Sequence, residues 1–74
     1  MSEQARLRMM MAAYNAGPRR VLQAINKAKE MGLDSNKWFR NVELAMLKLG
    51  YHEPVVYVSE INKRFVSYDL LGIK

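Results

Sequence analysis

An aromatic residue and an amide, Tyr14 and Asn15, lie at the end of a predicted helix, directly before Gly17 and Pro18. Asparagine offers amide donors and an acceptor, and tyrosine offers a hydroxyl and a flat face. Such a pair can bind a sugar that bears hydroxyl groups and an N-acetyl group. The alternative is that Tyr14 belongs to the core and Asn15 only caps the helix, and composition alone favours this second interpretation.

The other residue types capable of chemistry are isolated in the sequence. His52 is the single histidine, and Tyr51-His52-Glu53 lacks the second histidine of a His-Glu-x-x-His zinc helix. The run Met9-Met10-Met11 has no cysteine or histidine beside it, so adaptable core packing explains it better than binding of a soft metal. Trp38 can stack on a sugar ring, but an anchoring position in the core is the simpler interpretation. We therefore expect neither a metal site nor a cofactor.

Four helical segments separated by Gly or Pro account for nearly all of the sequence. The first covers residues 3–16 and ends at Gly17, and the second begins at Pro18 and ends at Gly32. In the first helix an apolar stripe is expected at i, i+3, i+4 and i+7, formed by Leu7, Met10, Met11 and Tyr14. In the second helix the residues at helical spacing are Val21, Leu22, Ile25 and Ala28.

The second half of the chain is expected to contain a loop and two further helices. Residues 33–40 are predicted to form a loop or tight turn that Trp38-Phe39 pins onto the core. The third helix follows Asn41 as N-cap, carries apolar residues on nearly every face and ends at Gly50, so it should be buried. The fourth begins at Pro54 and ends near Leu71 before Gly72, with an apolar stripe of Val58, Ile61, Phe65 and Tyr68.

The chain has 74 residues, which is enough for one domain at most. At this size only about 60% of the surface of the unfolded chain is buried on folding, so an independent fold is marginal. No cysteine is present, so neither a disulfide nor a thiolate metal site can stabilise a small core. We expect an all-α domain, a small bundle of about four helices that is stabilised by helix packing or by a missing piece of chain.

Twelve Lys and Arg against seven Asp and Glu give a formal charge of +5, which favours anionic partners such as nucleic acid, anionic lipid or acidic cell-wall polymer. The charges are spread along the whole chain, so solvated helix faces also explain them. No apolar run approaches the ~20 residues of a membrane span. Residues 1–4 do not resemble the start of a secretory signal. We expect no membrane span.

Two stretches of the sequence resemble motifs of one enzyme family. Ala13-Tyr14-Asn15-Ala16-Gly17-Pro18 resembles the Ala-Tyr-Asn-Ala-Gly motif of lytic transglycosylases of the soluble type, which have a lysozyme-like fold. Glu53-Pro54-Val55-Val56-Tyr57-Val58 is similar to the Glu-Thr-x-x-Tyr-Val motif that opens a late helix in that family. The order of the motifs and the helical character between them also agree, over most of residues 7–68. The resemblance implies that residues 1–74 are a single partial domain, the C-terminal half of the catalytic domain.

The family cleaves the β-1,4 bond between N-acetylmuramic acid and N-acetylglucosamine in peptidoglycan. One glutamate with a raised pKa protonates the leaving oxygen, and the 6-hydroxyl of the sugar then closes a 1,6-anhydro ring in place of attack by water. That glutamate belongs to a Glu-Ser motif upstream of Ala-Tyr-Asn-Ala-Gly. Glu3 is not followed by serine, so the motif cannot be placed in this chain. The resemblance therefore implies no catalytic residue here, and a chain that forms the wall and floor of the substrate groove.

The resemblance assigns five residues to substrate binding: Tyr14, Asn15, Gly17, Glu53 and Tyr57. It implies that the two tyrosines pack near the sugar, that Asn15 and Glu53 support it by hydrogen bonds, and that Gly17 makes the turn. Pro54 stands where the family has threonine, which leaves the local hydrogen bonding of the second motif open. A glutamate at a helix start feels the positive end of the dipole, which favours its carboxylate form and a positioning or capping role.

Three functions remain open at this point. The first is the peptidoglycan-binding portion of a lytic transglycosylase, inactive alone, bound to a glycan strand and completed by the N-terminal half of the domain, in a parent protein exported to the periplasm or cell envelope. The second is a basic nucleic-acid-binding module, against which the sequence argues because Pro18 and Gln23 fall where a helix-turn-helix needs apolar residues. The third is a helical protein-interaction module without catalysis.

Overall fold

The computed structural model describes the backbone of residues 1–71 and the side chains of residues 1–64. Four α-helices follow one another as α1 (Glu3–Ala16), α2 (Pro18–Glu30), α3 (Glu43–Lys48) and α4 (His52–Leu71), with an irregular helical turn, η1 (Trp38–Val42), before α3. Within residues 1–71 no strand is formed. The expected all-α bundle of about four helices is confirmed.

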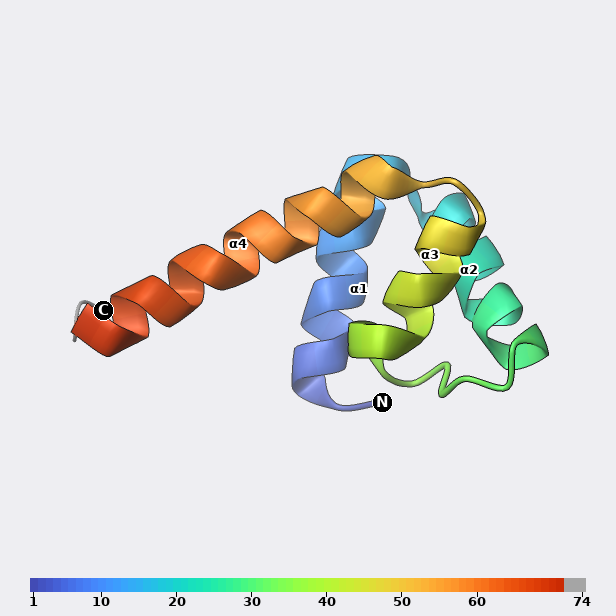
Figure 1. Ribbon diagram of the computed structural model, residues 1–74, viewed down its shortest axis with the longest axis horizontal. Coiled ribbons are helices and arrows are strands. Elements are labelled where there is room, and N and C mark those ends of the chain that lie inside the picture. The colour runs from blue at the N-terminus through green and yellow to red at the C-terminus, as the bar shows by residue number, and fades with distance from the viewer. Residues whose placement is uncertain (72–74) are drawn as a thin grey trace.

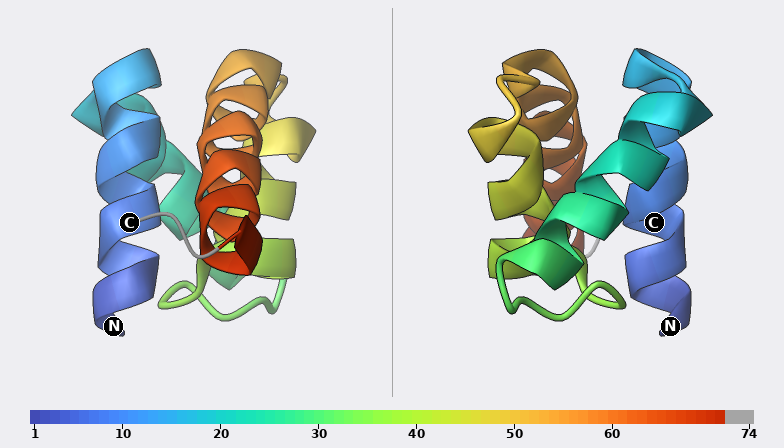
Figure 2. Two further views of the ribbon diagram at one scale, coloured as in Figure 1. Left: turned by 90° about the vertical axis from the view of Figure 1, so that its left-hand side faces the viewer. Right: turned by 90° about the vertical axis from the view of Figure 1, so that its right-hand side faces the viewer.

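The helices divide into a cluster and one projecting element. α1 packs against both α2 and α4, and α3 packs against α2 and α4. Figure 2 shows α2 crossing obliquely over the side of the cluster opposite to the projecting end of α4. The first turns of α4 lie on the cluster, and the rest of the helix extends away from it (Figure 1). None of the helices in this described part of the chain has the length and apolarity needed to cross a bilayer.

Small side chains form the contacts between the helices. Four alanines from three helices are fully buried: Ala12, Ala24, Ala28 and Ala45. Alanine at a helix contact lets two helix axes approach closely, because the distance between packed helices depends on the side chains at the crossing. The remaining core volume is filled by the largest fully buried side chains, which are Trp38, Val42, Met46 and Val58.

The buried face of α1 is not the predicted one. Its core residues are Ala5, Met9 and Ala12, at i, i+4 and i+7. Leu7 and Met10, which were predicted to be buried, are 48% and 60% exposed, and Met11 alone of that stripe packs partly against the core. Both faces have helical periodicity. The buried face is the one that α2 and α4 cover, and its two alanines allow these helices to approach α1.

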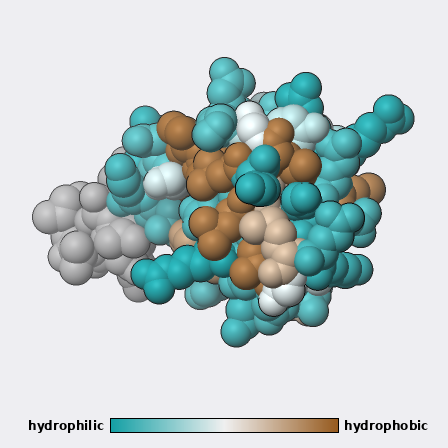
Figure 3. All heavy atoms as spheres, turned by 45° about the vertical axis from the view of Figure 1, so that its right-hand side comes forward, coloured by the Kyte–Doolittle hydropathy of each residue, from teal (hydrophilic) through white to brown (hydrophobic). Residues whose placement is uncertain are grey.

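The predicted buried residues of α2 and α3 are also corrected by the structure. On α2 the core residues are Val21, Ala24 and Ala28, while Leu22 is exposed. The third helix is not buried on every face, because Leu44 is 41% exposed. Figure 3 shows apolar side chains gathered on the face of the molecule that carries these two helices.

The connection into α3 is built around one left-handed residue. Trp38 is only 2% exposed and anchors the connection as predicted, whereas Phe39 is 45% exposed and does not. Arg40 has φ 60°, and its backbone N–H donates to Glu43 Oε1 over 3.1 Å. The Asn41 side chain accepts from Asp34 N–H and donates to the Phe39 carbonyl, so it ties the loop together instead of capping the helix by a side-chain hydrogen bond.

Glycines end α2 and α3 at the predicted positions. After α3, the Gly50 N–H donates to the Leu47 carbonyl and the Tyr51 N–H to the Met46 carbonyl, which is the hydrogen-bond pattern of a Schellman cap. This tight cap lets α4 begin at His52, two residues before the predicted start at Pro54. Gly72 and the side chains of Phe65 and Tyr68, also part of the predicted fourth helix, lie outside the described residues.

Two neighbouring methionines test which face of α1 is buried. Met9 is 6% exposed and Met10 is 60% exposed. We expect Met9→Ala to lower the free energy of unfolding by about 2–3 kcal/mol, because it leaves a cavity in the core. Met10→Ala should change it by less than about 0.5 kcal/mol. Urea unfolding followed by circular dichroism measures both, and equal losses in the two variants would contradict the assignment of the buried face.

Candidate functional site

The junction between α1 and α2 is a sharp corner made by Gly17. This residue has φ 97° and ψ 148°, a combination that only glycine adopts readily. Its N–H donates to the Ala13 carbonyl over 2.7 Å, which closes α1, and its carbonyl accepts from Val21 N–H, which opens α2. A Cβ at this position would meet nothing within 4 Å. Backbone conformation, and not lack of space, therefore requires glycine here.

Close to this corner the tyrosines of the two sequence motifs meet. The rings of Tyr14 on α1 and Tyr57 on α4 are stacked, with centroids 6.4 Å apart and planes inclined by 20°. Tyr14 is 85% exposed, so the prediction that it belongs to an apolar core stripe is wrong. The stack leaves most of the Tyr14 surface open to solvent, where a ligand can reach it.

The amide and the carboxylate of the two motifs line one pocket, which we call the corner pocket. It has a volume of about 210 Å³ and is lined by Asn15, Ala16, Arg20, Gly50, Tyr51, His52, Glu53 and Pro54. Asn15 comes from the last turn of α1 and Glu53 from the first turn of α4. The two helix ends are brought together because α1 and α4 pack against each other and because the Gly50 cap turns the chain directly into α4.

Six of the eight residues that line this pocket were not predicted as site residues, and Arg20 and Tyr51 are two of them. The guanidinium carbon of Arg20 lies 5.0 Å from the centroid of the Tyr51 ring, a cation–π contact. The Tyr51 hydroxyl donates a 2.7 Å hydrogen bond to Oε1 of Gln23. Tyr51 thereby joins the start of α4 to α2. The sequence does contain a signal for Tyr51, because it directly follows the helix-ending Gly50. A residue beside such a cap is held in place by the hydrogen bonds of the cap.

The five predicted site residues thus occupy one end of the molecule in two adjacent groups. Tyr14 and Tyr57 form the stack, while Asn15 and Glu53 line the corner pocket and Gly17 shapes the turn beside it. The arrangement offers an aromatic surface next to amide, carboxylate and guanidinium groups. It can bind a polar, ring-shaped ligand. Within the described residues no group of three His, Asp or Glu side chains could hold a metal ion.

Comparisons with protein-family models, with curated proteins and with solved structures found no match to this chain.

The Tyr51 hydrogen bond generates a test of how the corner pocket is held. We expect Tyr51→Phe to lower the free energy of unfolding by about 0.5–1 kcal/mol, because the change removes the hydroxyl that bonds to Gln23. Tyr14→Phe is the matched control and should have no measurable effect, since that side chain is largely solvated. Chemical unfolding of both variants gives the comparison. A loss for Tyr14→Phe as large as for Tyr51→Phe would argue against the proposed link.

Proposed function

We propose that this chain is the peptidoglycan-binding portion of a lytic murein transglycosylase and that it binds a glycan strand across the Tyr14–Tyr57 stack and the corner pocket. The observation that carries the proposal is the meeting of two motifs that are far apart in the sequence. Tyr14 and Tyr57 come from the two stretches that resemble the family, and their rings lie 6.4 Å apart.

The chemistry of the site supports a sugar as ligand. An exposed aromatic ring offers a flat apolar surface that suits the C–H face of a pyranose, and the 85% exposure of Tyr14 makes that surface available. Beside it, Asn15 can donate to and accept from an N-acetyl group, and Glu53 can accept from sugar hydroxyls. An amino sugar uses all three kinds of contact.

The same site supports binding without cleavage by the chain alone. The family's reaction needs a carboxylic acid that donates a proton to the leaving oxygen. Among the residues that line the corner pocket, the carboxylate is Glu53. It is exposed and lies in the first turn of α4. An exposed carboxylate suits a hydrogen-bond acceptor that positions the ligand, whereas a proton donor for this reaction needs burial among apolar groups.

Titration of the chain with a chitooligosaccharide tests this proposal. We expect ¹⁵N-edited NMR spectra to show saturable shifts centred on Tyr14, Asn15 and Tyr57. Tyr14→Ala should weaken binding by roughly tenfold, as expected for loss of about 1–1.5 kcal/mol of aromatic contact. Phe39→Ala removes another exposed aromatic ring, one outside the corner pocket, and should leave the affinity unchanged.

Two results would contradict the proposal. The first is an absence of saturable shifts at these residues with either chitooligosaccharide or a muropeptide. The second is formation of 1,6-anhydro product by the chain alone, detected by mass spectrometry of a murein digest, since that would require an acid that we have not assigned.

The outer face of α1 favours a second role as a surface for protein contact. Leu7 and Met10 are 48% and 60% exposed there, three residues apart on one face. Single exposed apolar residues are common on protein surfaces. Two at helical spacing, on a helix that ends at the corner pocket, suggest that another polypeptide covers this face of α1. We propose that this face receives the N-terminal half of the transglycosylase domain, the segment that carries the family's Glu-Ser motif.

Mixing this chain with a polypeptide that contains such an N-terminal half tests the second role. We expect association by isothermal titration calorimetry and the appearance of 1,6-anhydro product. Met10→Glu should weaken the association by tenfold or more, because it places a charge in the contact. Met31→Glu changes another exposed methionine, at the far end of α2, and should have no effect. Equal effects of the two substitutions, or no association, would count against this role.

A further inference from the structure

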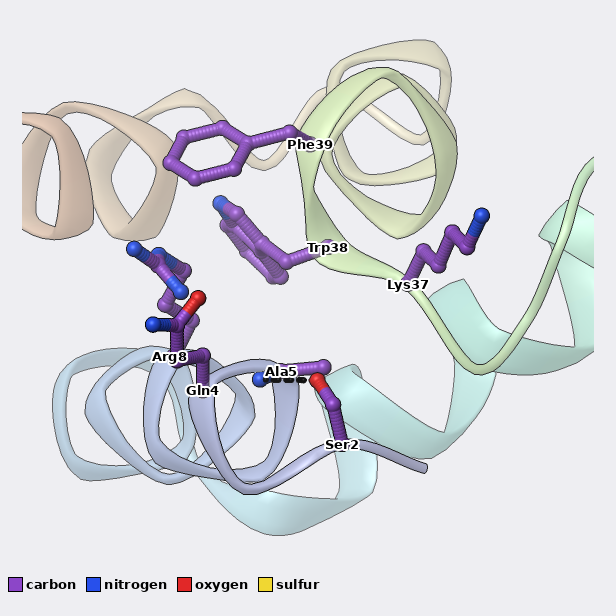
Figure 4. A pocket seen from close by; sticks show the side chains of 7 residues that line it. All are labelled: Ser2, Gln4, Ala5, Arg8, Lys37, Trp38 and Phe39. Carbon is purple, nitrogen blue, oxygen red and sulfur yellow. Dashed lines mark hydrogen bonds between the residues drawn. The ribbon is translucent and has the colours of Figure 1, made fainter.

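A second pocket lies at the opposite end of α1 from the corner pocket, and we call it the N-terminal pocket. Its volume is about 230 Å³, and it is lined by Ser2, Gln4, Ala5, Arg8, Lys37, Trp38 and Phe39 (Figure 4). It is formed between the first turns of α1 and the segment that enters η1. None of these residues belongs to the Tyr14–Tyr57 stack or to the corner pocket.

Two buried nitrogen donors in this pocket have no partner. Nε1 of Trp38 and Nε of Arg8 are both buried, and neither finds a hydrogen-bond acceptor within the described part of the chain. Trp38 is almost fully buried, with only 2% of its surface exposed. Buried donors are nearly always paired, because leaving one unpaired costs its full desolvation. Two such donors in one pocket therefore indicate that an acceptor belongs there.

The groups that carry the two donors lie on the same side of the pocket. In Figure 4 the indole nitrogen of Trp38 and the guanidinium of Arg8 point toward the same space, with the Phe39 ring beside it. The guanidinium is held in position from two sides. Its Nη2 donates to Asn62 Oδ1 over 3.0 Å, and its carbon lies 4.6 Å from the centroid of the Phe39 ring. These two contacts hold the Arg8 side chain in place without a ligand, and its Nε–H remains without an acceptor.

The electrostatics of the pocket favour a negative ligand. Arg8 and Lys37 are both cationic, and none of the described lining residues is Asp or Glu. The N-terminus of α1 also lies at this pocket, where the Ala5 N–H donates to Ser2 Oγ over 3.0 Å. The positive end of the helix dipole therefore adds to the positive potential of Arg8 and Lys37. The acceptor that the two donors lack should therefore carry negative charge.

We propose that the N-terminal pocket binds a carboxylate, with one oxygen accepting from Trp38 Nε1 and the other from Arg8 Nε. A carboxylate presents two coplanar oxygens, so a single group can pair with both donors. The carbon behind it would lie against the Phe39 ring. The outer wall consists of exposed Gln4, Lys37 and Phe39, and because both nitrogens are buried the proposal requires these side chains to move aside when a carboxylate binds. The carboxylate can belong to a free small acid or to the C-terminal end of a peptide.

The single tryptophan makes the site directly observable, because the chain gives one indole N–H signal in a ¹⁵N-edited NMR spectrum. Titration with sodium acetate should move this signal progressively to saturation. Sodium chloride at equal ionic strength and neutral acetamide should not reproduce the shift. N-acetyl-alanine is the second ligand: tighter binding than acetate assigns the carboxylate to a peptide end, and equal binding assigns it to free small acids. Both results support the site.

Variants separate this site from a general charge effect. Arg8→Gln should weaken acetate binding about tenfold or more, the effect expected for loss of a charge-assisted hydrogen bond. Arg6→Gln makes the same change of charge at an exposed position of α1 outside the pocket and should have no effect. Gln4→Glu supplies a carboxylate from the chain itself and suits the helix N-terminus. It should shift the indole signal without ligand and compete with acetate.

The proposal is overturned if the indole signal does not saturate with either carboxylate or moves equally with acetamide. It is also overturned if Arg8→Gln, shown to be folded by its backbone spectrum, binds as well as the parent chain. Gln4→Glu tests the same claim should Arg8→Gln prove unfolded, and an unshifted indole signal in that variant counts against the site. None of these outcomes depends on whether the chain binds oligosaccharides at Tyr14.

Discussion

The helices of this protein pack around a core that contains four fully buried alanines, and α1 faces this core with Ala5, Met9 and Ala12. Ala12, Ala24 and Ala28 are fully buried in one core cluster to which α1 and α2 both contribute. Leu7, Met10 and Tyr14 are therefore directed outward, although their spacing alone is typical of a buried stripe.

The two pockets both follow from the orientation of α1. At its C-terminal end, the exposed Tyr14 meets Tyr57 across the α1–α4 contact, and the Gly17 corner sets Asn15 at the edge of the corner pocket. At its N-terminal end, Arg8 is turned toward η1, where it contacts Phe39. One helix thus contributes to an aromatic, sugar-compatible surface and to a separate cationic pocket, at opposite ends.

The loop before α3 shows how local hydrogen bonds support such an arrangement without a large core. Arg40 adopts a left-handed backbone, which costs an ordinary residue about 1–2 kcal/mol. Hydrogen bonds from Arg40 N–H to Glu43 and between Asn41 and its neighbours hold this turn. The result is that Trp38 enters the core while Phe39 stays at the surface beside Arg8. The N-terminal pocket exists because these two adjacent aromatic rings separate in this way.

The sequence by itself determined the helical class, the helix-ending glycines and the burial of Trp38, because those depend on local backbone preference and on side-chain size. It also singled out Tyr14, Asn15, Glu53 and Tyr57 through the two motifs. Only the tertiary structure decided that Ala12 and not Met10 faces the core, because two faces of α1 have the same periodicity and the choice depends on which face α2 and α4 cover. Likewise, the pairing of Tyr51 with Gln23 and the convergence of Arg8 and Trp38 join residues far apart in the chain, which no local pattern records.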